Sequence, residues 1–515
     1  QTCALPICEG LVRNLESWLD QCPPGAGPNW NSASELADRI LNWSVVWQLM
    51  GGWNSVMFDS PGGGQLRAHW MQSIVAHCQV IHDNFSRHSS ANNHLIGELT
   101  GLYVAARTWP LTRQADEWAT HTKRELEREA VAQHFADGGN REQAFAYQVF
   151  ANEYLLVAGV CGERSADRFS DSYWNVLRNT RLFLRAMSNT CGDMPMVGDA
   201  DDGAVLRLEP RSDISRAVLL TTVIEALFAP SKLSSDSVTA RWLGADGLLS
   251  NRVVESLGDH SEHAWKFPDS GYYVFGSDFQ KPNEIKGLVD CGELGYLGIA
   301  AHGHADALSL CLSVAGEPCL VDPGTYAYGD IHQWREYFRS TAAHNTVCID
   351  GANQSVSGGR FLWLHKARTT VEKTPSSPGQ FEFTGSHDGY LRLADPVRHR
   401  RKVSFDKTTR ELLVLDTIHA KATHDIAQHW HFAPHVKVKL SDKSCVFAQG
   451  RRFQVVIHWP SQDVSLSLVN GQEVPPLGWH SRAYGVKEPS PVVRAQVITS
   501  ASRIQTRISI HPDDV

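Results

Sequence analysis

The sequence has few of the features that mark membrane proteins or nucleic-acid-binding proteins. No apolar run approaches the roughly 18 residues that a membrane-spanning helix needs. Acidic residues outnumber Lys and Arg by 56 to 48, and the resulting net charge of −8 argues against general nucleic-acid binding. The same charge would repel an acidic glycan, so any site for a polyanion must be a local patch of basic residues.

Cysteine pairs at metal-binding or redox spacing are also absent. The chain has 11 cysteines, an odd number, with no CxxC pair and no close regular spacing. This pattern describes neither a disulfide framework nor a cysteine zinc site. We expect most of these cysteines to be buried as small apolar side chains.

A signal peptide is not recognisable at the start of the chain. The sequence begins with Gln1, and "QTCALPIC" lacks a basic start, a long apolar centre and a small-residue cleavage site. We expect the native N-terminus to lie upstream of Gln1, and the cellular location does not follow from this chain.

The hydrophobic pattern divides the chain into two halves. The 515 residues, 42% hydrophobic and 20% charged, are enough for two or more soluble domains. Apolar residues recur at helical spacing over about 34–228, as in "SELADRILNWSVVWQLM" and "SRAVLLTTVIEALF", and with a period of two from about 262. We predict an all-α domain over 1–240, a linker over 241–261 and an antiparallel β-sandwich over 262–515.

Two stretches in the helical half combine unusual residue types. "SSANNHLIGE" holds Asn93 and His94, and either Asn92 or Asn93 could simply cap the helix that follows. "DGGNREQAFAYQVFANEY" places Tyr147 within a helix, where an aromatic side chain is more often part of the core. "GDADDG", at 198–203, does not fit an EF-hand loop, so we interpret it as a turn.

Two further stretches lie in the sheet half. "HGHADALSL", at 302–310, leads into alternating apolar residues, and a half-buried strand here would project His302, His304 and Asp306 to one side. "LVDPGTYAYGDIHQWREYFRSTAAHNTVCIDG" carries Asp322 and His344. Imidazoles and a carboxylate suit zinc, but the spacings of 18 and 22 residues between His304, Asp322 and His344 fit no short zinc motif, so ordinary hydrogen-bonded histidines remain an alternative.

These stretches occur in an order that resembles the heparinase II/III-like polysaccharide lyases. The similarity covers about residues 28–420, and its specific part is "GHGHADALSL" with "VDPGTY", followed by "YFRSTAAHNTV". It implies an α/α toroid followed by an antiparallel β-sandwich, and cleavage of a uronate-containing glycan by β-elimination. Heparan sulfate, other glycosaminoglycans, alginate and bacterial exopolysaccharides are all possible substrates, and a periplasmic or secreted location is expected.

The resemblance also assigns catalytic roles. Asn93 and His94 would contact the uronate carboxyl group, Tyr147 would protonate the leaving O4, and His302 would be the second proton-transfer residue. If the C5 proton and O4 lie on one face of the sugar, Tyr147 could perform both transfers. A free tyrosine has a pKa of about 10, so Tyr147 would need basic neighbours to act as a base.

The remaining assignments concern a metal and the cleft wall. His304, Asp322 and His344 match positions at which some family members hold zinc, which we expect to be structural. Trp334, Arg335 and Arg339 are candidate wall residues for the substrate, although Arg339 could equally pair with a buried carboxylate. "VRHRRKVSF", at 397–405, is basic, and we interpret it as a solvated sheet face.

Two other functions compete with the lyase. A metal-dependent glycan hydrolase would use the His/Asp/His set to activate water. A glycan-binding protein would keep the fold without turnover. Retention of all four proton-transfer and carboxyl-binding positions favours an active enzyme, whereas the sequence leaves the oligomeric state open.

Overall fold

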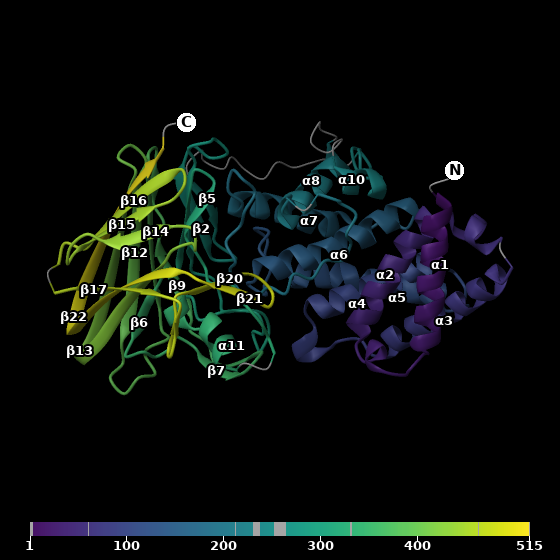
Figure 1. Cartoon of the computed structure of the whole chain (residues 1–515), viewed down its shortest axis with the longest axis horizontal. Helices are drawn as coiled ribbons and strands as arrows, with labels where there is room; N and C mark the ends of the chain where they lie inside the picture. The colour runs from purple at the N-terminus through teal and green to yellow at the C-terminus, as the bar shows by residue number, and fades with distance from the viewer. Residues whose placement is uncertain are drawn as a thin grey trace.

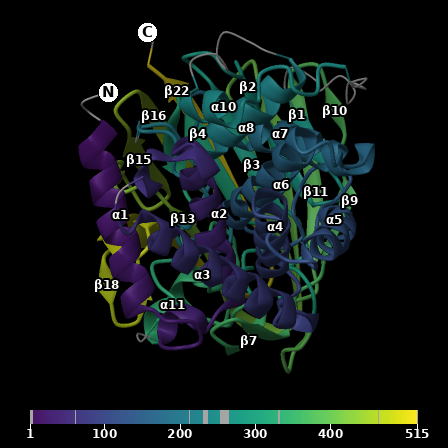
Figure 2. The same cartoon turned by 90° about the vertical axis from the view of Figure 1, so that its right-hand side faces the viewer.

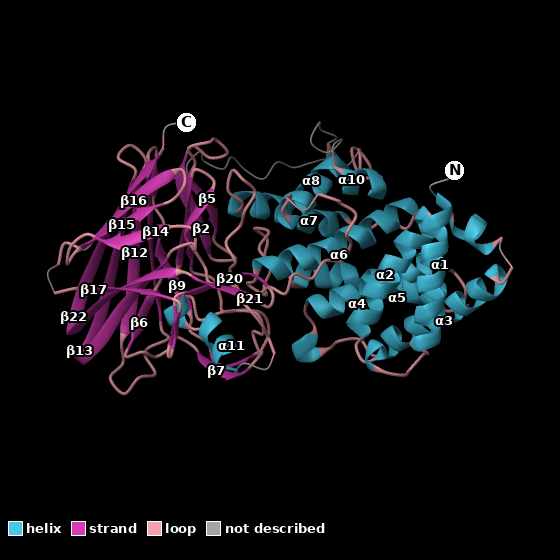
Figure 3. Cartoon of the chain, in the orientation of Figure 1, coloured by secondary structure: helices cyan, strands magenta, loops and turns pink. Residues whose placement is uncertain are grey.

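The computed structural model describes residues 4–59, 61–211, 213–229, 237–251, 264–329, 332–461 and 463–513. Helices occupy one end of an elongated molecule and strands the other (Figures 1 and 3). This order confirms the predicted fold class, a helical N-terminal region followed by an antiparallel β-structure. Among the described helices, none combines the length and hydropathy needed to cross a bilayer.

The helical region is built from long helices that pack side by side (Figure 2). They are α1 Ala4–Gln21, α2 Ala33–Leu49, α3 Gly63–Asp83, α4 Asn93–Thr108, α5 Ala115–Ala132, α6 Phe145–Arg164, α7 Asp171–Met187, α8 Arg216–Phe228 and α10 Val238–Leu243. Short 3-10 turns lie at Pro28–Trp30, Gly52–Asn54, Val56–Phe58 and His88–Ser90. Ser32, Ser170, Ser215 and Ser237 cap the helices that they precede, because each side chain accepts a backbone N–H of the first turn.

Two antiparallel sheets form the other half. The first has the order β1 Ala264–Phe267, β2 Tyr272–Ser277, β3 Ile285–Asp290, β4 Leu310–Val314 and β5 Glu317–Leu320. The second contains β6 Val347–Ile349, β9 Thr369–Lys373, β10 Ser376–Ser377, β11 Gln380–His387, β12 Arg398–Asp406, β13 Glu411–His431, β14 Lys437–Leu440, β15 Cys445–Gln449, β16 Phe453–His458, β17 Ser465–Asn470 and β22 Pro491–Pro512.

Shorter elements lie outside the two sheets. Three two-stranded ribbons pair β7 Val356–Gly359 with β8 Leu362–His365, β18 Gln472–Glu473 with β19 Pro476–Leu477, and β20 Trp479–Ala483 with β21 Val486–Pro489. Helix α11 spans His332–Phe338, and a 3-10 turn follows at Thr341–Ala343. The described cysteines are all free thiols.

The five-stranded sheet is buried on both faces and joins the two halves. Tyr272 and Val274 of β2 belong to the core of the helical region, whereas Tyr273 and Phe275 pack against the large sheet. Alternate side chains of one strand therefore enter two different cores. Loops that leave this sheet start at the junction with the helices. The candidate catalytic and metal-binding residues lie at this junction.

One expectation about strands was wrong, and another holds only for alternate residues. Residues 302–309 form a buried loop, and β4 begins only at Leu310, partly because Leu308 adopts a left-handed backbone with φ 62°. His302, His304 and Asp306 therefore project from a loop. The 397–405 stretch is not simply solvated either, because β12 buries His399 and Arg401 completely while Arg398 is exposed.

Close packing of α4 against α2 gives a test of the helical core. A Cβ added at Gly101 would lie 2.6 Å from Ala37 Cβ, so Gly101→Ala should destabilise the protein by about 1–3 kcal/mol through overpacking. Gly64→Ala in α3 is the matched control, because nothing lies within 4 Å of its added Cβ. Thermal unfolding of both variants measures the effect, and equal midpoints would contradict this packing.

Candidate active site and metal centre

The predicted proton-transfer residues meet at the junction of the two halves. Tyr147 lies in the first turns of α6 and His302 in the loop before β4, yet their rings stack with centroids 3.8 Å apart and planes 19° from parallel. Both side chains are almost fully buried. The helical half and the sheet half therefore contribute one group each to a shared site.

Asn92 and Asn93, at the start of α4, make different contacts. Asn92 is the cap, because its Oδ1 accepts the His94 backbone N–H at 3.2 Å. Asn93 turns inward, and its Nδ2 donates to the two carboxylate oxygens of Glu142 at 3.1 and 2.9 Å. His94 is exposed on the same turn. Asn93 therefore faces the buried Glu142, whereas Asn92 both caps α4 and lines a pocket of the site.

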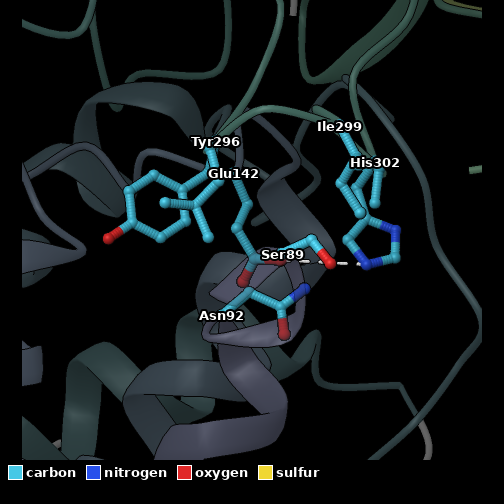
Figure 4. Close-up of a pocket in the computed structure, with 8 residues that line it drawn as sticks. Ser89, Asn92, Glu142, Tyr296, Ile299 and His302 are labelled. Carbon is cyan, nitrogen blue, oxygen red and sulfur yellow. Dashed lines mark ion pairs between the residues drawn. The ribbon is translucent and has the colours of Figure 1, made fainter. Parts of the chain in front are cut away.

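Glu142 contacts both Asn93 and His302, and Figure 4 shows it beside His302 in a pocket. Its Oε2 is 3.8 Å from His302 Nε2, and both residues line a small pocket with Ser89, Asn92, Tyr296 and Ile299. Burial raises the pKa of Glu142, although His302 and Asn93 oppose that shift. The imidazole edge at Nε2 therefore faces a pocket, and the opposite edge faces the protein.

Asp199 is the central acceptor of the site. It is fully buried, and it accepts hydrogen bonds from His302 Nδ1 at 3.2 Å, from His304 Nε2 at 3.0 Å and from both terminal nitrogens of Arg335. Burial alone would raise the pKa of Asp199, but Arg335 and the two histidines hold that pKa well below its usual range. An ionised Asp199 fixes the proton of His302 on Nδ1 and leaves a lone pair on Nε2.

Tyr147 has acidic partners rather than basic ones. Its hydroxyl donates to Asp201 Oδ2 at 2.9 Å and lies 3.0 Å from the hydroxyl of Tyr328. Burial and the Asp201 carboxylate raise the pKa of Tyr147 above its ordinary value. The basic neighbours that a tyrosinate base needs are not its hydrogen-bond partners here, so the environment favours the neutral form of Tyr147.

A larger cavity of about 1000 Å³ opens beside Tyr147. Its lining comes from both halves and includes Phe150 and Arg216 on the helical side and Leu312 and Pro318 on the sheet side. A cavity of this size accommodates a small oligosaccharide.

Four buried side chains form a candidate metal centre. They are His304, Asp306, Asp322 and His344, and one ligand atom from each lies within 4.8 Å of the others. The sequence-based set contained three of them and omitted Asp306. The three residues that the family resemblance assigned to a metal are thus brought together.

The hydrogen bonds of the two histidines fit a bound cation. His304 Nδ1 and His344 Nε2 face each other at 3.3 Å, while His304 Nε2 is bonded to Asp199 and His344 Nδ1 to the Ser340 carbonyl. With a proton on each outer nitrogen, two lone pairs converge, which is favourable only around a cation. Burial, reinforced by Asp290 nearby, raises the pKa values of Asp306 and Asp322 well above their ordinary range, and a divalent cation would offset this cost.

The candidate wall residues are buried against protein partners. Trp334 packs against Trp479 and lies 3.9 Å from Lys487 Nζ, and Arg335 is the ion-pair partner of Asp199. Arg339 donates to the Glu336 carboxylate at 2.6 Å. All three side chains contact other protein groups, and none of them lines the cavity beside Tyr147.

Sequence reasoning gave no role to three acidic residues of the site, Glu142, Asp199 and Asp201, and it left Asp306 out of the metal set. Two of them lie in "GDADDG", which the structure shows as an irregular loop between α7 and α8. The density of acids in that stretch was the available signal. Its meaning depends on Arg335, which lies 136 residues away in the sequence.

The chain matches two family models over most of its length. Residues 8–210 match "Heparinase II/III N-terminus" and residues 259–511 match "Heparinase II/III-like, C-terminal". No match was found among curated protein sequences.

Solved structures share the fold at low sequence identity. A crystal structure of heparinase III has a TM-score of 0.76 at 16% identity, covering 98% of this chain and 74% of that one. A mutant of the heparan sulfate lyase HepC from Pedobacter heparinus has a TM-score of 0.68 at 18% identity, covering 98% and 72%. The chondroitin AC lyase of Streptomyces coelicolor A3 has a TM-score of 0.55 at 9% identity, covering 98% and 70%.

The candidate metal centre predicts that zinc stabilises the fold. A free Zn²⁺ concentration 100 times the dissociation constant should add about 2.7 kcal/mol to the free energy of unfolding. Asp306→Asn should reduce this gain because it removes one charged donor. Denaturant unfolding with zinc or with a chelator measures the difference, and Asp395→Asn, at a carboxylate bonded to His424 elsewhere, is the control. Identical wild-type curves under the two conditions would contradict the assignment.

Proposed function

Because the chain belongs to the heparinase II/III-like family of polysaccharide lyases, we propose that it cleaves a uronate-containing acidic glycan by β-elimination. The observation that carries this proposal is the stacking of Tyr147 on His302, which gives one sugar ring access to a proton donor and a proton acceptor together. The product would carry a C4–C5 double bond.

The chemical difficulty of this reaction is the proton at C5. Its removal places negative charge beside a carboxylate that is already charged, so donors must stabilise the developing enolate. A base must lie at C5, and an acid must protonate O4 as it leaves. The site offers a candidate for each of these tasks.

His302 is the base in this proposal. Asp199 binds its Nδ1, so the lone pair of Nε2 is available on the side of the pocket. The negative charge of Asp199 would also stabilise the imidazolium that forms when Nε2 takes the C5 proton. Asp199 is therefore a positioning residue that acts through His302.

Tyr147 is the acid. Its raised pKa disfavours a tyrosinate, which argues against a single tyrosine that performs both transfers. Donation of the phenolic proton to O4 would leave a transient tyrosinate, and the hydroxyl of Tyr328 at 3.0 Å could stabilise it by a hydrogen bond. This division of labour is the one expected when the C5 proton and O4 lie on opposite faces of the sugar.

The uronate carboxyl group is assigned to the first turn of α4. His94 is exposed there, and the N-terminal end of a helix favours an anion. Asn93 would join it by exchanging its bond to Glu142 for one to the substrate. These donors would neutralise the carboxylate as the enolate develops.

A divalent cation at His304, Asp306, Asp322 and His344 has a structural role in this proposal. All four donors are buried. His304 Nε2 is hydrogen-bonded to Asp199, so the position of the ligand set and the position of Asp199 depend on each other. The imidazole and carboxylate donors suit zinc but also other transition metals. When bound, the ion would supply positive charge that balances the buried carboxylates.

A panel of acidic glycans tests the reaction class. Formation of a product with strong ultraviolet absorbance indicates elimination, and Tyr147→Phe and His302→Ala should each lower kcat by about 10²- to 10⁴-fold. Tyr173→Phe is the matched control, because that buried hydroxyl donates to the Leu155 carbonyl at 2.6 Å in the helical core. Saturated products would indicate hydrolysis and overturn the proposal, as would full activity in both site variants.

Asp199→Asn tests the orientation of His302. The amide has nearly the same shape but cannot hold the Nδ1–H in the same way, so kcat should fall by about 10²-fold or more while KM changes little. Asp167→Asn, which disrupts an ion pair with Arg107 and Lys123 in the helical half, is the control. An unchanged kcat for a folded Asp199→Asn protein would show that His302 does not need this carboxylate.

A further inference from the structure

Asn345 connects the three chain segments that carry the candidate metal ligands. It is fully buried and directly follows His344. Its Nδ2 donates to the carbonyl of Leu310 at 2.8 Å and to that of Val321 at 2.9 Å, and its Oδ1 accepts the His431 backbone N–H at 2.6 Å. Leu310 directly follows the loop that holds His304 and Asp306, and Val321 precedes Asp322. One carboxamide thus links all three segments.

Arg401 makes a second set of links from the large sheet. Its Nη1 donates to the carbonyl of Leu308 at 2.8 Å and to that of Asn345 at 2.7 Å. The rest of the guanidinium forms a two-point ion pair with Asp416 of β13, at 2.8 and 2.9 Å. Arg401 therefore fixes the backbone on either side of the metal centre without contacting any of its ligand atoms.

Each side-chain nitrogen of Arg401 and each carboxylate oxygen of Asp416 takes part in at least one hydrogen bond within the protein. Asp416 also accepts from His399 Nε2 at 2.7 Å and from Gln428 Nε2 at 2.6 Å. Arg401 and Asp416 have no exposed surface. A buried charge pair is tolerated only when its remaining hydrogen-bonding groups are satisfied, and this network meets that condition.

The backbone at Leu308 shows why such support is needed. A left-handed φ of 62° is unfavourable for a leucine and persists only where surrounding groups hold it. The Leu308 N–H donates to the Asp290 carbonyl at 2.8 Å, and the Leu308 carbonyl accepts from Arg401. Both polar groups of this strained residue are occupied by protein partners.

We propose that Asn345 and the Arg401–Asp416 pair are positioning residues that arrange the metal centre before any ion binds. The inference deepens the proposed function and rests on it in one respect, because the segment they fix also carries His302. A preformed ligand set spares the ion the cost of ordering three loops. Loss of such outer hydrogen bonds typically costs about 10- to 100-fold in metal affinity.

Hydrogen exchange of the metal-free protein tests the inference directly. The wild-type protein treated with EDTA should protect the amides of residues 303–309 and 344–346 almost as well as the same protein with Zn²⁺. Arg401→Lys keeps the charge but not the geometry of four hydrogen bonds, and Asn345→Ser removes the carboxamide. In both variants exchange of these segments in EDTA should be at least about 10-fold faster, with partial recovery in Zn²⁺.

Calorimetric titration with Zn²⁺ gives a second readout. Both variants should bind zinc about 10- to 100-fold more weakly, whereas Arg107→Lys, at the ion pair with Asp167 in the helical half, should bind as the wild type does. Rapid exchange of the wild-type segments in EDTA, followed by protection only with Zn²⁺, would overturn the proposal even if both variants fail to fold. Wild-type exchange and zinc affinity in the folded variants would overturn it as well.

Neither measurement depends on turnover. If the protein yields no unsaturated product but shows the predicted protection and zinc affinities, the proposed reaction fails and the positioning role stands. If product forms normally while the segments exchange freely without metal, the positioning role fails alone.

Discussion

The buried ion pair between Asp199 and Arg335 is the interaction on which the site depends. An isolated carboxylate at this depth would be very costly, and the guanidinium lets it remain ionised among two imidazoles. One oxygen faces His302 and the other faces His304. A single charge therefore orients both His302, the proposed proton-transfer group, and His304, a candidate metal ligand. Asp199 lies in a loop of the helical half, although both histidines belong to the sheet half.

The five-stranded sheet explains why this junction is precise. Each of its central strands sends alternate side chains into two cores, so the sheet has a fixed position relative to both the helices and the large sheet. The loops that follow β3 and β5 leave from this doubly buried layer. A catalytic arrangement that draws on both halves needs such a rigid joint, because displacements of about 1 Å are enough to impair proton transfer.

The sequence predicted the fold better than the contacts within the site. Helical and strand periods are local properties, so α2, α3, α6 and α8 and most of the principal strands were recognisable without a structure. The convergence of His304, Asp322 and His344 followed from a family resemblance. The partners of these residues could not be read in the same way, because Asp199 and Arg335, or Arg401 and Leu308, are distant in sequence and meet only through tertiary packing. The interpretation of 397–405 as a solvated face failed at Arg401 for the same reason. The ion pair that buries Arg401 cannot be inferred from its neighbours in the sequence.

The two-sided burial of the first sheet also limits how this protein can be divided. A recombinant fragment that ends before β1 would leave the helical core without the side chains of Tyr272, Val274 and Leu288, and a fragment that begins there would present the same side chains to water. Each fragment would expose an apolar surface where it normally packs against the other fragment, and such a surface promotes aggregation. Attempts to graft the helical half onto a different sandwich, or to shuffle the halves between relatives, would therefore have to carry this sheet along or redesign one whole face of it.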